Sequence, residues 1–200
     1  MPLYDSVAAL SVPLLYGPYR LRASGVEKLP AGGFVLAANH VSNFDPWPLG
    51  LPLWPRRHLH FMAKAELYWW PLRYALDAVG AFRVRRDAPD RSSIETAVAL
   101  CRAGEVVAMF PEGTRRAKGL RKKYEAFPRT GAARIALRAG VPIVPAATRG
   151  TDRLARFGPL RVAYGAPLDL DDLRDADRRH AANEATERLM VRIAELEETL

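Results

Sequence analysis

The polar stretch NHVSNFD, residues 39–45, carries the side chains best suited to chemistry. It follows directly on the apolar run 34–38, and within it His40 precedes Asp45 by five residues. A neutral imidazole accepts a proton near pH 7. A carboxylate beside it holds the useful tautomer and stabilises the cation that forms. The pair is therefore a candidate for activating a hydroxyl group.

The spacing of His40 and Asp45 sets a condition on this hypothesis. A step of five residues on an ideal helix turns about 140° past one full turn, so the two side chains would not share a face. They meet only if the chain bends between them, and Asp45-Pro46 is typical of a helix cap followed by a first-turn proline. Two structural explanations stay open: Asp45 is an N-cap, or His40 is a hydrogen-bonded core residue. The HxxxxD pattern by itself is weak evidence for catalysis.

A second polar group follows the apolar run 106–110. It offers a carboxylate, a glycine where a ligand can approach the backbone, a hydroxyl, and an arginine whose planar fork matches phosphate oxygens. In open α/β sheets, ligands bind at the carboxyl ends of strands. We therefore expect this group and the 39–45 stretch to line one crevice. The members are Glu112, Gly113, Thr114 and Arg115, with Arg86 after a third apolar run.

Basic residues outnumber acidic ones, which gives a formal net charge of +8. This excess points to anionic partners, namely phosphorylated substrates, an anionic membrane surface or nucleic acid. The charge is densest in residues 115–123, where six of nine side chains are cationic. A loop of this kind can steer a phosphorylated thiol carrier, hold the protein on acidic lipid, or bind nucleic acid weakly.

Apolar runs alternate with helical patterns along the chain, which predicts a single α/β domain over residues 1–200. We expect a largely parallel central sheet flanked by helices, with the active-site crevice at the carboxyl ends of its strands. A capping box at residues 92–95 starts one helix, and residues 130–139 form another that Gly140 ends. The predicted strands are 34–38, 59–63, 81–84, 106–110, 143–147 and 160–164.

Helices are predicted at both ends of the chain. Residues 3–16 predict an apolar helix that is too short to span a bilayer and that either packs on the core or lies at a membrane interface. No signal peptide is recognised there. Residues 177–199 predict an amphipathic helix packed on the domain. The segment 64–79 is helical in pattern. Its aromatic cluster, residues 68–70, suits either a membrane interface or the core, and we expect most of it to lie in the core.

A single cysteine excludes an internal disulfide and is consistent with a reducing compartment. Cys101 falls at helical spacing with Ile94, Ala97 and Val98, which favours a core position over a nucleophilic role. Four scattered histidines and no paired cysteines argue against a structural zinc site.

The polar groups together resemble the signatures of the glycerophospholipid acyltransferase family, the family of 1-acylglycerol-3-phosphate O-acyltransferases. Its NHxSxxD motif corresponds to residues 39–45, and its FPEGTR motif to residues 110–115. Its glycine followed six residues later by arginine corresponds to Gly80 and Arg86, and its GVPIVP-type strand to residues 140–145. All four occur in order within residues 34–148, and this combination is highly specific.

The resemblance implies a role for each matched residue. His40 would be the general base and Asp45 its orienting partner, with no metal and no cofactor. The acyl donor would be acyl-CoA or acyl-carrier protein as a co-substrate. The glycerol phosphate would be bound by Arg86, Glu112, Gly113, Thr114 and Arg115. Arg83, Arg85 and Arg116 depart from the usual pattern and leave the acceptor open.

The predicted function is acyl transfer to the free hydroxyl of a lysophospholipid, with 1-acylglycerol-3-phosphate as the expected acceptor, in phospholipid biosynthesis. The expected location is cytoplasmic, in peripheral contact with the anionic inner face of the cell membrane, with no nucleic-acid partner. Two alternatives are weighed against it. The same base could activate water in a thioester hydrolase, and the charge alone is compatible with a non-enzymatic nucleic-acid-binding protein.

Overall fold

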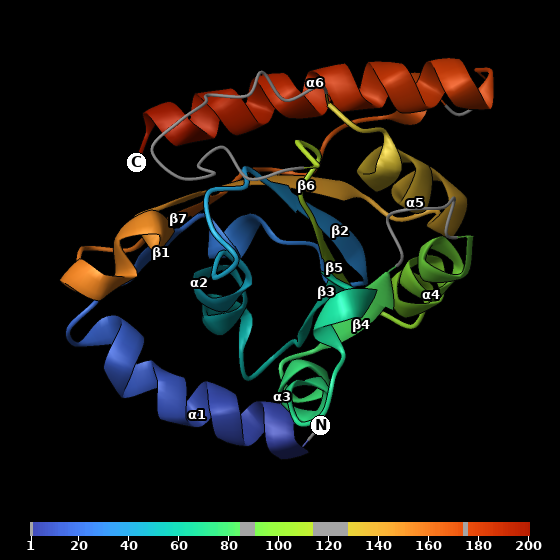
Figure 1. The fold of residues 1–200 in the computed structure, drawn as a ribbon. Helices are drawn as coiled ribbons and strands as arrows, with labels where there is room; N and C mark the ends of the chain where they lie inside the picture. The colour runs from blue at the N-terminus through green and yellow to red at the C-terminus, as the bar shows by residue number, and fades with distance from the viewer. Residues whose placement is uncertain (1, 85–90, 114–127, 174–175) are drawn as a thin grey trace, which may run out of the picture.

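A seven-stranded sheet forms the centre of the computed structural model, which describes residues 2–84, 91–113, 128–173 and 176–200. The strand order is β1-β7-β6-β2-β5-β3-β4 (Figure 1). All neighbours pair in parallel except β6 and β7, which are antiparallel. The strands are β1 (Arg22–Ser24), β2 (Phe34–Ala38), β3 (Leu59–Lys64), β4 (Ala81–Val84), β5 (Val106–Met109), β6 (Ile143–Arg149) and β7 (Arg161–Tyr164).

Strand β2 lies at the centre of the sheet because it is apolar on both faces. Every residue of Phe34–Ala38 is buried. Phe34 and Leu36 face one hydrophobic cluster, whereas Val35 and Ala37 face a second. A continuous apolar run of this kind is what a parallel strand covered on both sides requires.

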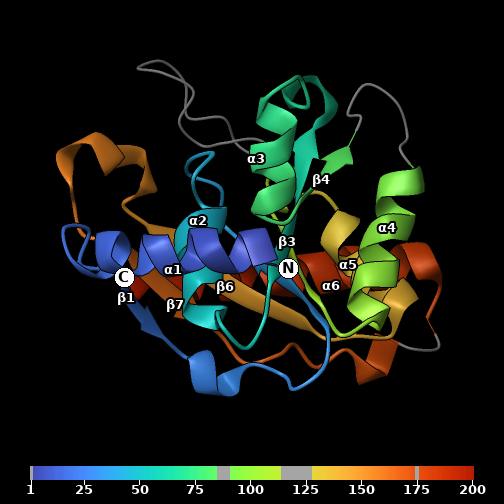
Figure 2. The same ribbon diagram turned by 90° about the horizontal axis from the view of Figure 1, so that it is seen from below.

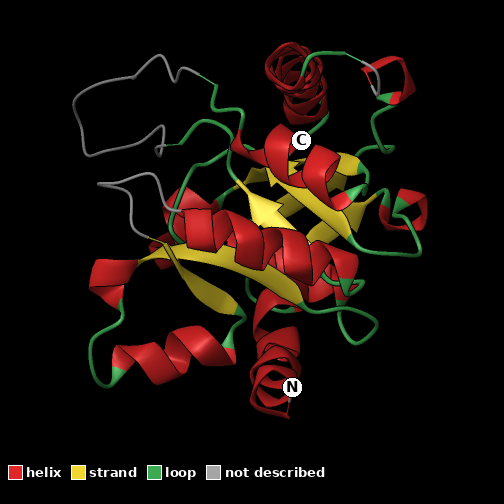
Figure 3. Cartoon of the chain, turned by 90° about the vertical axis from the view of Figure 1, so that its right-hand side faces the viewer, coloured by secondary structure: helices red, strands yellow, loops and turns green. Residues whose placement is uncertain are grey.

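Helices cover both faces of the sheet (Figures 1 and 3). On one face, α4, α5 and α6 supply the helical side of one cluster. On the other face, α1 and α2 supply the helical side of the second cluster, and α3 packs beside β4 and α1. The helices are α1 (Pro2–Tyr16), α2 (Pro46–Gly50), α3 (Leu72–Ala78), α4 (Arg91–Arg102), α5 (Gly131–Ala139) and α6 (Arg178–Glu198).

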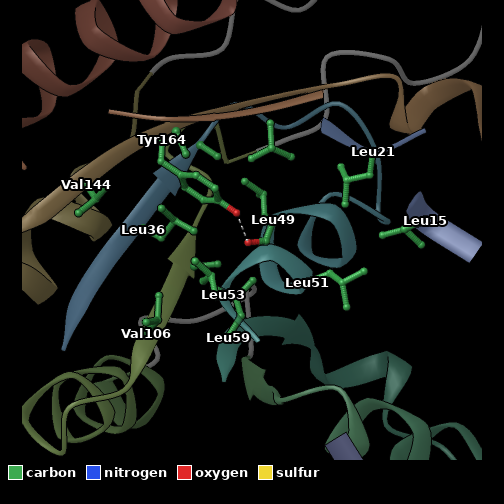
Figure 4. Close-up of a cluster of buried hydrophobic side chains, with 14 of the residues drawn as sticks. Leu15, Leu21, Leu36, Leu49, Leu51, Leu53, Leu59, Val106, Val144 and Tyr164 are labelled. Atoms are coloured by element: carbon green, nitrogen blue, oxygen red, sulfur yellow. Dashed lines mark hydrogen bonds between the residues drawn. The ribbon is translucent and has the colours of Figure 1, made fainter. Parts of the chain in front are cut away.

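The short helix α2 is anchored to the sheet by a buried hydrogen bond. The Tyr164 hydroxyl donates to the Leu49 carbonyl oxygen at 2.7 Å, inside the leucine-rich cluster of Figure 4. Tyr164 is 1% exposed, and burial raises its pKa well above the ordinary value. The tyrosine therefore remains a hydrogen-bond donor, and it holds the helix that begins directly after Asp45.

The fold class agrees with the prediction, and the six predicted runs are all strands. The sequence missed β1, because a three-residue strand containing Arg22 and Ser24 carries no apolar pattern. It also did not reveal that β7 runs antiparallel to β6. Cys101 is buried in the core as expected, and burial raises the pKa of its thiol to about 12.

Helix α1 has one buried and one exposed face, both with apolar side chains. The buried face packs on the sheet side of the molecule, so this helix is partly a core element. The opposite face presents apolar side chains to solvent, and Figure 2 shows that α1 lies at the outside of the molecule. The buried face consists of Tyr4, Ala8, Ser11 and Leu15, and the exposed one includes Leu3, Leu10, Leu14 and Tyr16. Within the residues that the structure describes, no helix has the length and apolar character to cross a bilayer.

The expectation that the aromatic cluster 68–70 lies mostly in the core is wrong. Trp69 and Trp70 are 58% and 72% exposed, and only Tyr68 is half-buried. The segment is not one helix. Strand β3 continues to Lys64, a 3₁₀ turn follows, and α3 begins only at Leu72. The tryptophans therefore fall on the turn before α3, and α3 packs beside β4, the edge strand of the sheet in the described part of the chain.

Candidate active site

Asn39 joins the start of the turn between β2 and α2 to strand β6 by hydrogen bonds. The Asn39 side chain donates to the Thr148 carbonyl oxygen at 3.0 Å, and its Oδ1 accepts from the Thr148 N–H at 2.8 Å. Both hydrogen bonds are buried, and they join the carboxyl end of β2 to β6. An amide side chain satisfies a donor and an acceptor at once, so the turn leaves the sheet in a defined direction.

His40 and Asp45 meet across this turn. Nδ1 of His40 lies 2.8 Å from Oδ2 of Asp45. The chain bends as the spacing requires, because the Asp45 N–H donates to the Ser42 carbonyl oxygen at 3.2 Å. Pro46 then starts α2, and the Asp45 side chain makes no capping hydrogen bond to that helix. The N-cap explanation for Asp45 is therefore excluded.

The Asp45 carboxylate is fully buried and well supplied with donors. Its Oδ2 accepts from the N–H groups of Val41 and Ser42, at 2.8 and 2.9 Å, as well as facing His40. Its Oδ1 accepts from the Thr151 hydroxyl. Burial of a carboxyl group is tolerated only with partners of this kind. The aspartate is held as an acceptor for Nδ1–H, so Nε2 is the His40 nitrogen available to an external group.

His40 sits against the residue that opens the second motif. Its ring stacks on Phe110, with centroids 4.2 Å apart and planes 20° apart. The His40 side chain is 12% exposed. It is thus a largely buried, hydrogen-bonded histidine, as the structural explanation requires, yet it reaches the surface at the carboxyl end of β2. The same geometry suits a general base.

The start of the second motif lies at the same edge, because β2 and β5 are parallel neighbours. Glu112 is buried, and Gly113 has a φ of +68°. A side chain at Gly113 would also collide with that of Arg129, whose N–H donates to the Pro111 carbonyl oxygen at 2.7 Å. The structure therefore places the start of the second motif at the same end of the sheet as His40, with Phe110 against the imidazole ring.

The remaining predicted site residues lie outside the described part of the chain. They are Arg86, Thr114 and Arg115, together with Arg85, Arg116 and the rest of the basic stretch 115–123.

A cavity of about 460 Å³, lined by two arginines and one aspartate, Asp77, lies beside the segment that leads to Arg86. The Arg83 guanidinium stands 4.8 Å from the ring centroid of Tyr68, and Arg73 stacks on Tyr74 at 4.5 Å. Burial raises the pKa of Tyr68 to about 12, so its hydroxyl stays protonated. This side of the edge offers positive charge and aromatic faces.

Sequence reasoning missed Thr151 and Arg129. Thr151 lies 106 residues from the aspartate that it contacts, and only its place just after β6 could have drawn attention to it. Arg129 lies sixteen residues after Gly113, beyond the basic run 115–123, and no sequence pattern links the two. The two hydrogen bonds by which the Asn39 side chain joins β2 to β6 were likewise not predicted.

Comparisons with known proteins agree with this geometry. A family model described as "Acyltransferase" matches residues 20–149. A 1-acyl-sn-glycerol-3-phosphate acyltransferase of Bacillus subtilis is 36% identical over 87% of this chain and 86% of its own length. A probable 1-acyl-sn-glycerol-3-phosphate acyltransferase of Mycoplasma pneumoniae is 32% identical over 78% of this chain and 65% of its own.

A crystal structure with the same fold is that of PlsC, the 1-acyl-sn-glycerophosphate acyltransferase of Thermotoga maritima. It aligns with a TM-score of 0.63 at 23% identity and covers 92% of this chain and 76% of PlsC. At that identity the likeness shows the fold, whereas the family model and the Bacillus relative carry the assignment. From these matches and the resemblance of its motifs, we conclude that the chain belongs to the acyltransferase family.

Proposed function

We propose that the protein transfers a fatty acyl group from an acyl thioester to the free hydroxyl of a lysophospholipid, with 1-acylglycerol-3-phosphate as the acceptor, in phospholipid biosynthesis. The observation that carries this proposal is the His40–Asp45 pair at the carboxyl end of β2, beside Glu112 and Gly113. The names of the Bacillus and Mycoplasma relatives support the choice of acceptor.

In this mechanism His40 is the general base. Its Nε2 removes the proton from the acceptor hydroxyl while that oxygen attacks the thioester carbonyl carbon. When the tetrahedral intermediate collapses, the carbon–sulfur bond breaks and the imidazolium returns the proton to the leaving thiolate. Asp45 keeps Nδ1 protonated and stabilises the imidazolium. A positioned base contributes typically about 10²–10⁴ in rate.

No acyl-enzyme is required. Ser42, the serine within the motif, has a local structural task, because its hydroxyl oxygen accepts from the Phe44 N–H at 3.3 Å. This hydrogen bond helps to form the bend that brings Asp45 back to His40. We assign Ser42 to the turn and not to nucleophilic attack.

The acceptor phosphate is assigned to the β5 and β4 side of His40. Glu112 and Gly113 lie there, and Thr114, Arg115 and Arg86 continue the two segments that end there. The cavity with Arg73 and Arg83 adds positive charge on the same side. Arginine suits this task because its fork pairs with two phosphate oxygens.

We further propose that the protein touches an anionic membrane surface through α1 and the turn before α3. Leu10 and Leu14 on α1 are exposed, and so are Trp69 and Trp70 next to α3. The two helices contact each other (Figures 1 and 2). Apolar and aromatic side chains gathered on one surface are typical of interfacial binding, and this position would bring His40 close to lysolipids.

A product assay tests the proposal. The purified protein is given acyl-CoA or acyl-acyl-carrier protein with a panel of lysophospholipids, and lipid products and free fatty acid are measured together. Formation of phosphatidic acid from 1-acylglycerol-3-phosphate is expected. Release of fatty acid without a lipid product would instead establish a hydrolase, and transfer to a different lysophospholipid would correct the acceptor.

A further inference from the structure

A second basic cavity, of about 440 Å³, opens where β6 ends and β7 begins. The turn between the two strands is η4 (Thr151–Arg156). A volume of this size falls within the range of about 300–1,000 Å³ that small-molecule sites occupy. Four arginines line the cavity, and we call it the η4 cavity; they are Arg149, Arg153, Arg156 and Arg161.

The positive charge of the η4 cavity is poorly compensated. Arg149 donates to the main-chain oxygen of Leu200 at 2.7 Å, and Arg161 donates to the Arg20 carbonyl oxygen at 2.9 Å. Arg153 lies 3.6 Å from Asp152 at the surface. For Arg156 no ion pair is found within the part of the chain that the structure describes. The four guanidinium groups thus outnumber the acidic side chains paired with them, since Asp152 alone pairs with them among the described residues, and this arrangement suits an anion with several negative oxygens.

The η4 turn is held in a strained shape. Phe157, directly after it, has a φ of +47°, which is uncommon for a residue with a side chain. Its ring packs on Tyr19 at 5.3 Å between centroids, and the Tyr19 hydroxyl donates to the Leu154 carbonyl oxygen at 3.1 Å. Strained backbone that the surrounding contacts enforce is concentrated at functional sites.

The η4 cavity is directly connected to the catalytic pair. Gly150 lines the cavity, the next residue is Thr151, and Thr151 donates to Asp45, which faces His40. One peptide bond and two hydrogen bonds therefore separate the cavity wall from the proposed base. In the strand order, the cavity lies on the β6 and β7 side of His40, whereas Glu112 lies on the β5 side.

We propose that the η4 cavity binds the phosphate groups of a nucleotide carrier, namely the adenosine 3′,5′-bisphosphate portion of an acyl-CoA donor. The inference rests on the proposed acyl transfer, because two anionic substrates must meet at His40. The acceptor phosphate is assigned to the β5 and β4 side, which leaves the η4 cavity for the donor. The flexible pantetheine arm then spans from the cavity to the thioester beside His40.

A concave site favours a nucleotide over the two other sources of negative charge. The acidic surface of a carrier protein requires a broad basic face, whereas here four arginines line one concave site. A lipid headgroup requires a neighbouring apolar surface for its chains. Beside η4, Phe157 is an exposed apolar side chain, whereas α1 and the turn before α3 carry several of them, so the larger apolar surface lies away from the η4 cavity.

The test removes two of the four charges with the variant Arg153→Ala/Arg156→Ala. The matched control, Arg134→Ala/Arg179→Ala, removes two exposed arginines from α5 and α6, which lie away from η4. Two readouts are taken at one ionic strength: the KM for acyl-CoA, and the affinity for free adenosine 3′,5′-bisphosphate by calorimetry. We expect both to weaken by roughly 10- to 100-fold in the cavity variant and to stay within about twofold in the control. The KM for the lysophospholipid should not change.

Gly158→Asp provides an independent second variant. A side chain added at Gly158 meets nothing within 4 Å, and Gly158 is not among the glycines with positive φ. A carboxylate at the cavity wall should repel the bisphosphate and weaken its binding, by less than the loss of two arginines because only one charge is changed. Gly158→Asn, which has the same shape without the charge, should have a smaller effect.

The outcomes separate the possible ligands. The proposal is overturned if the cavity variants leave bisphosphate affinity and acyl-CoA KM unchanged, or if wild-type protein ignores the bisphosphate and accepts only acyl-carrier protein. It is also overturned if the variants lose only their binding to vesicles of anionic phospholipid, which would assign the cavity to a headgroup. If wild-type protein transfers no acyl group at all, the proposed function fails, and the bisphosphate titration still decides on the cavity.

Discussion

The His40–Asp45 turn and the η4 cavity lie at one edge of the sheet but differ in burial and bonding. Asp45 is fully buried and accepts hydrogen bonds from Val41, Ser42 and Thr151, whereas Arg153 and Arg156 are exposed at the surface. A buried group whose oxygens all accept hydrogen bonds fixes the positions of the residues around it. An exposed guanidinium supplies charge that a ligand can neutralise. Changes in the turn should therefore lower kcat, and changes in the cavity should raise the KM of one substrate.

The strongest test of the turn is His40→Ala. Removal of the base should lower kcat by about 10²–10⁴ while the protein stays folded, because the imidazole is a site residue at the end of β2 and not part of the central apolar clusters. Steady-state kinetics at saturating donor and acceptor measure the loss, and thermal unfolding checks the fold. Turnover close to wild type would refute the assignment of the base.

Thr151→Val tests how far the catalytic function of the turn depends on a residue from a distant part of the chain. The substitution removes the hydroxyl that donates to Asp45 Oδ1 and keeps the side-chain volume. Loss of one hydrogen bond to a charged group corresponds to about 1.5–3 kcal/mol, so we expect kcat to fall roughly 10- to 100-fold with little change in either KM. Thr151→Ser should restore most of the rate, because it returns the donor. A raised donor KM with unchanged kcat would show that Thr151 contributes to donor binding in the η4 cavity and not to the catalytic turn.

The apolar surface of α1 and the α3 turn offers a further contrast with the η4 cavity. Leu10→Ser/Trp70→Ser removes two of its most exposed apolar side chains. Partitioning onto vesicles that contain anionic phospholipid should fall roughly 10-fold or more, since each apolar side chain transferred from water is worth about 1.5–3 kcal/mol. Vesicle sedimentation measures this.

Val191→Ser is the matched control for that surface, because it removes an apolar side chain of α6 that is 58% exposed on the other face of the sheet. Equal loss of vesicle binding in the control and in the Leu10→Ser/Trp70→Ser variant would contradict a specific membrane face.

The smallest expected effect concerns the anchor of α2. Tyr164→Phe leaves the Leu49 carbonyl oxygen without its buried donor, which should lower the free energy of unfolding by about 1–3 kcal/mol. Denaturant unfolding measures the change, and Tyr74→Phe, at an exposed tyrosine, serves as the comparison. A loss of kcat far beyond the loss of folded protein would show that the anchor also sets the position of the catalytic turn.

Much of the fold was predictable because its signals are local. The apolar run at Phe34–Ala38 and the runs that form its neighbours identify the strands of a parallel sheet, and the motifs that follow them indicate the acyltransferase family. The errors arose where a signal was absent or not local. Strand β1 has no apolar run, and Trp69 and Trp70 are exposed because the chain turns before α3 at an edge of the sheet.

By itself, the sequence determined which side chains are the candidates for chemistry and which strands precede them, since both follow from residue type and order along the chain. Only the tertiary structure decided that Thr151 donates to Asp45 and that Arg153 and Arg156 share a cavity with Arg149 and Arg161. These contacts join residues from separate elements. Their distances depend on how β6 and β7 pair and on how η4 is held against Tyr19, and no periodicity along the chain encodes either.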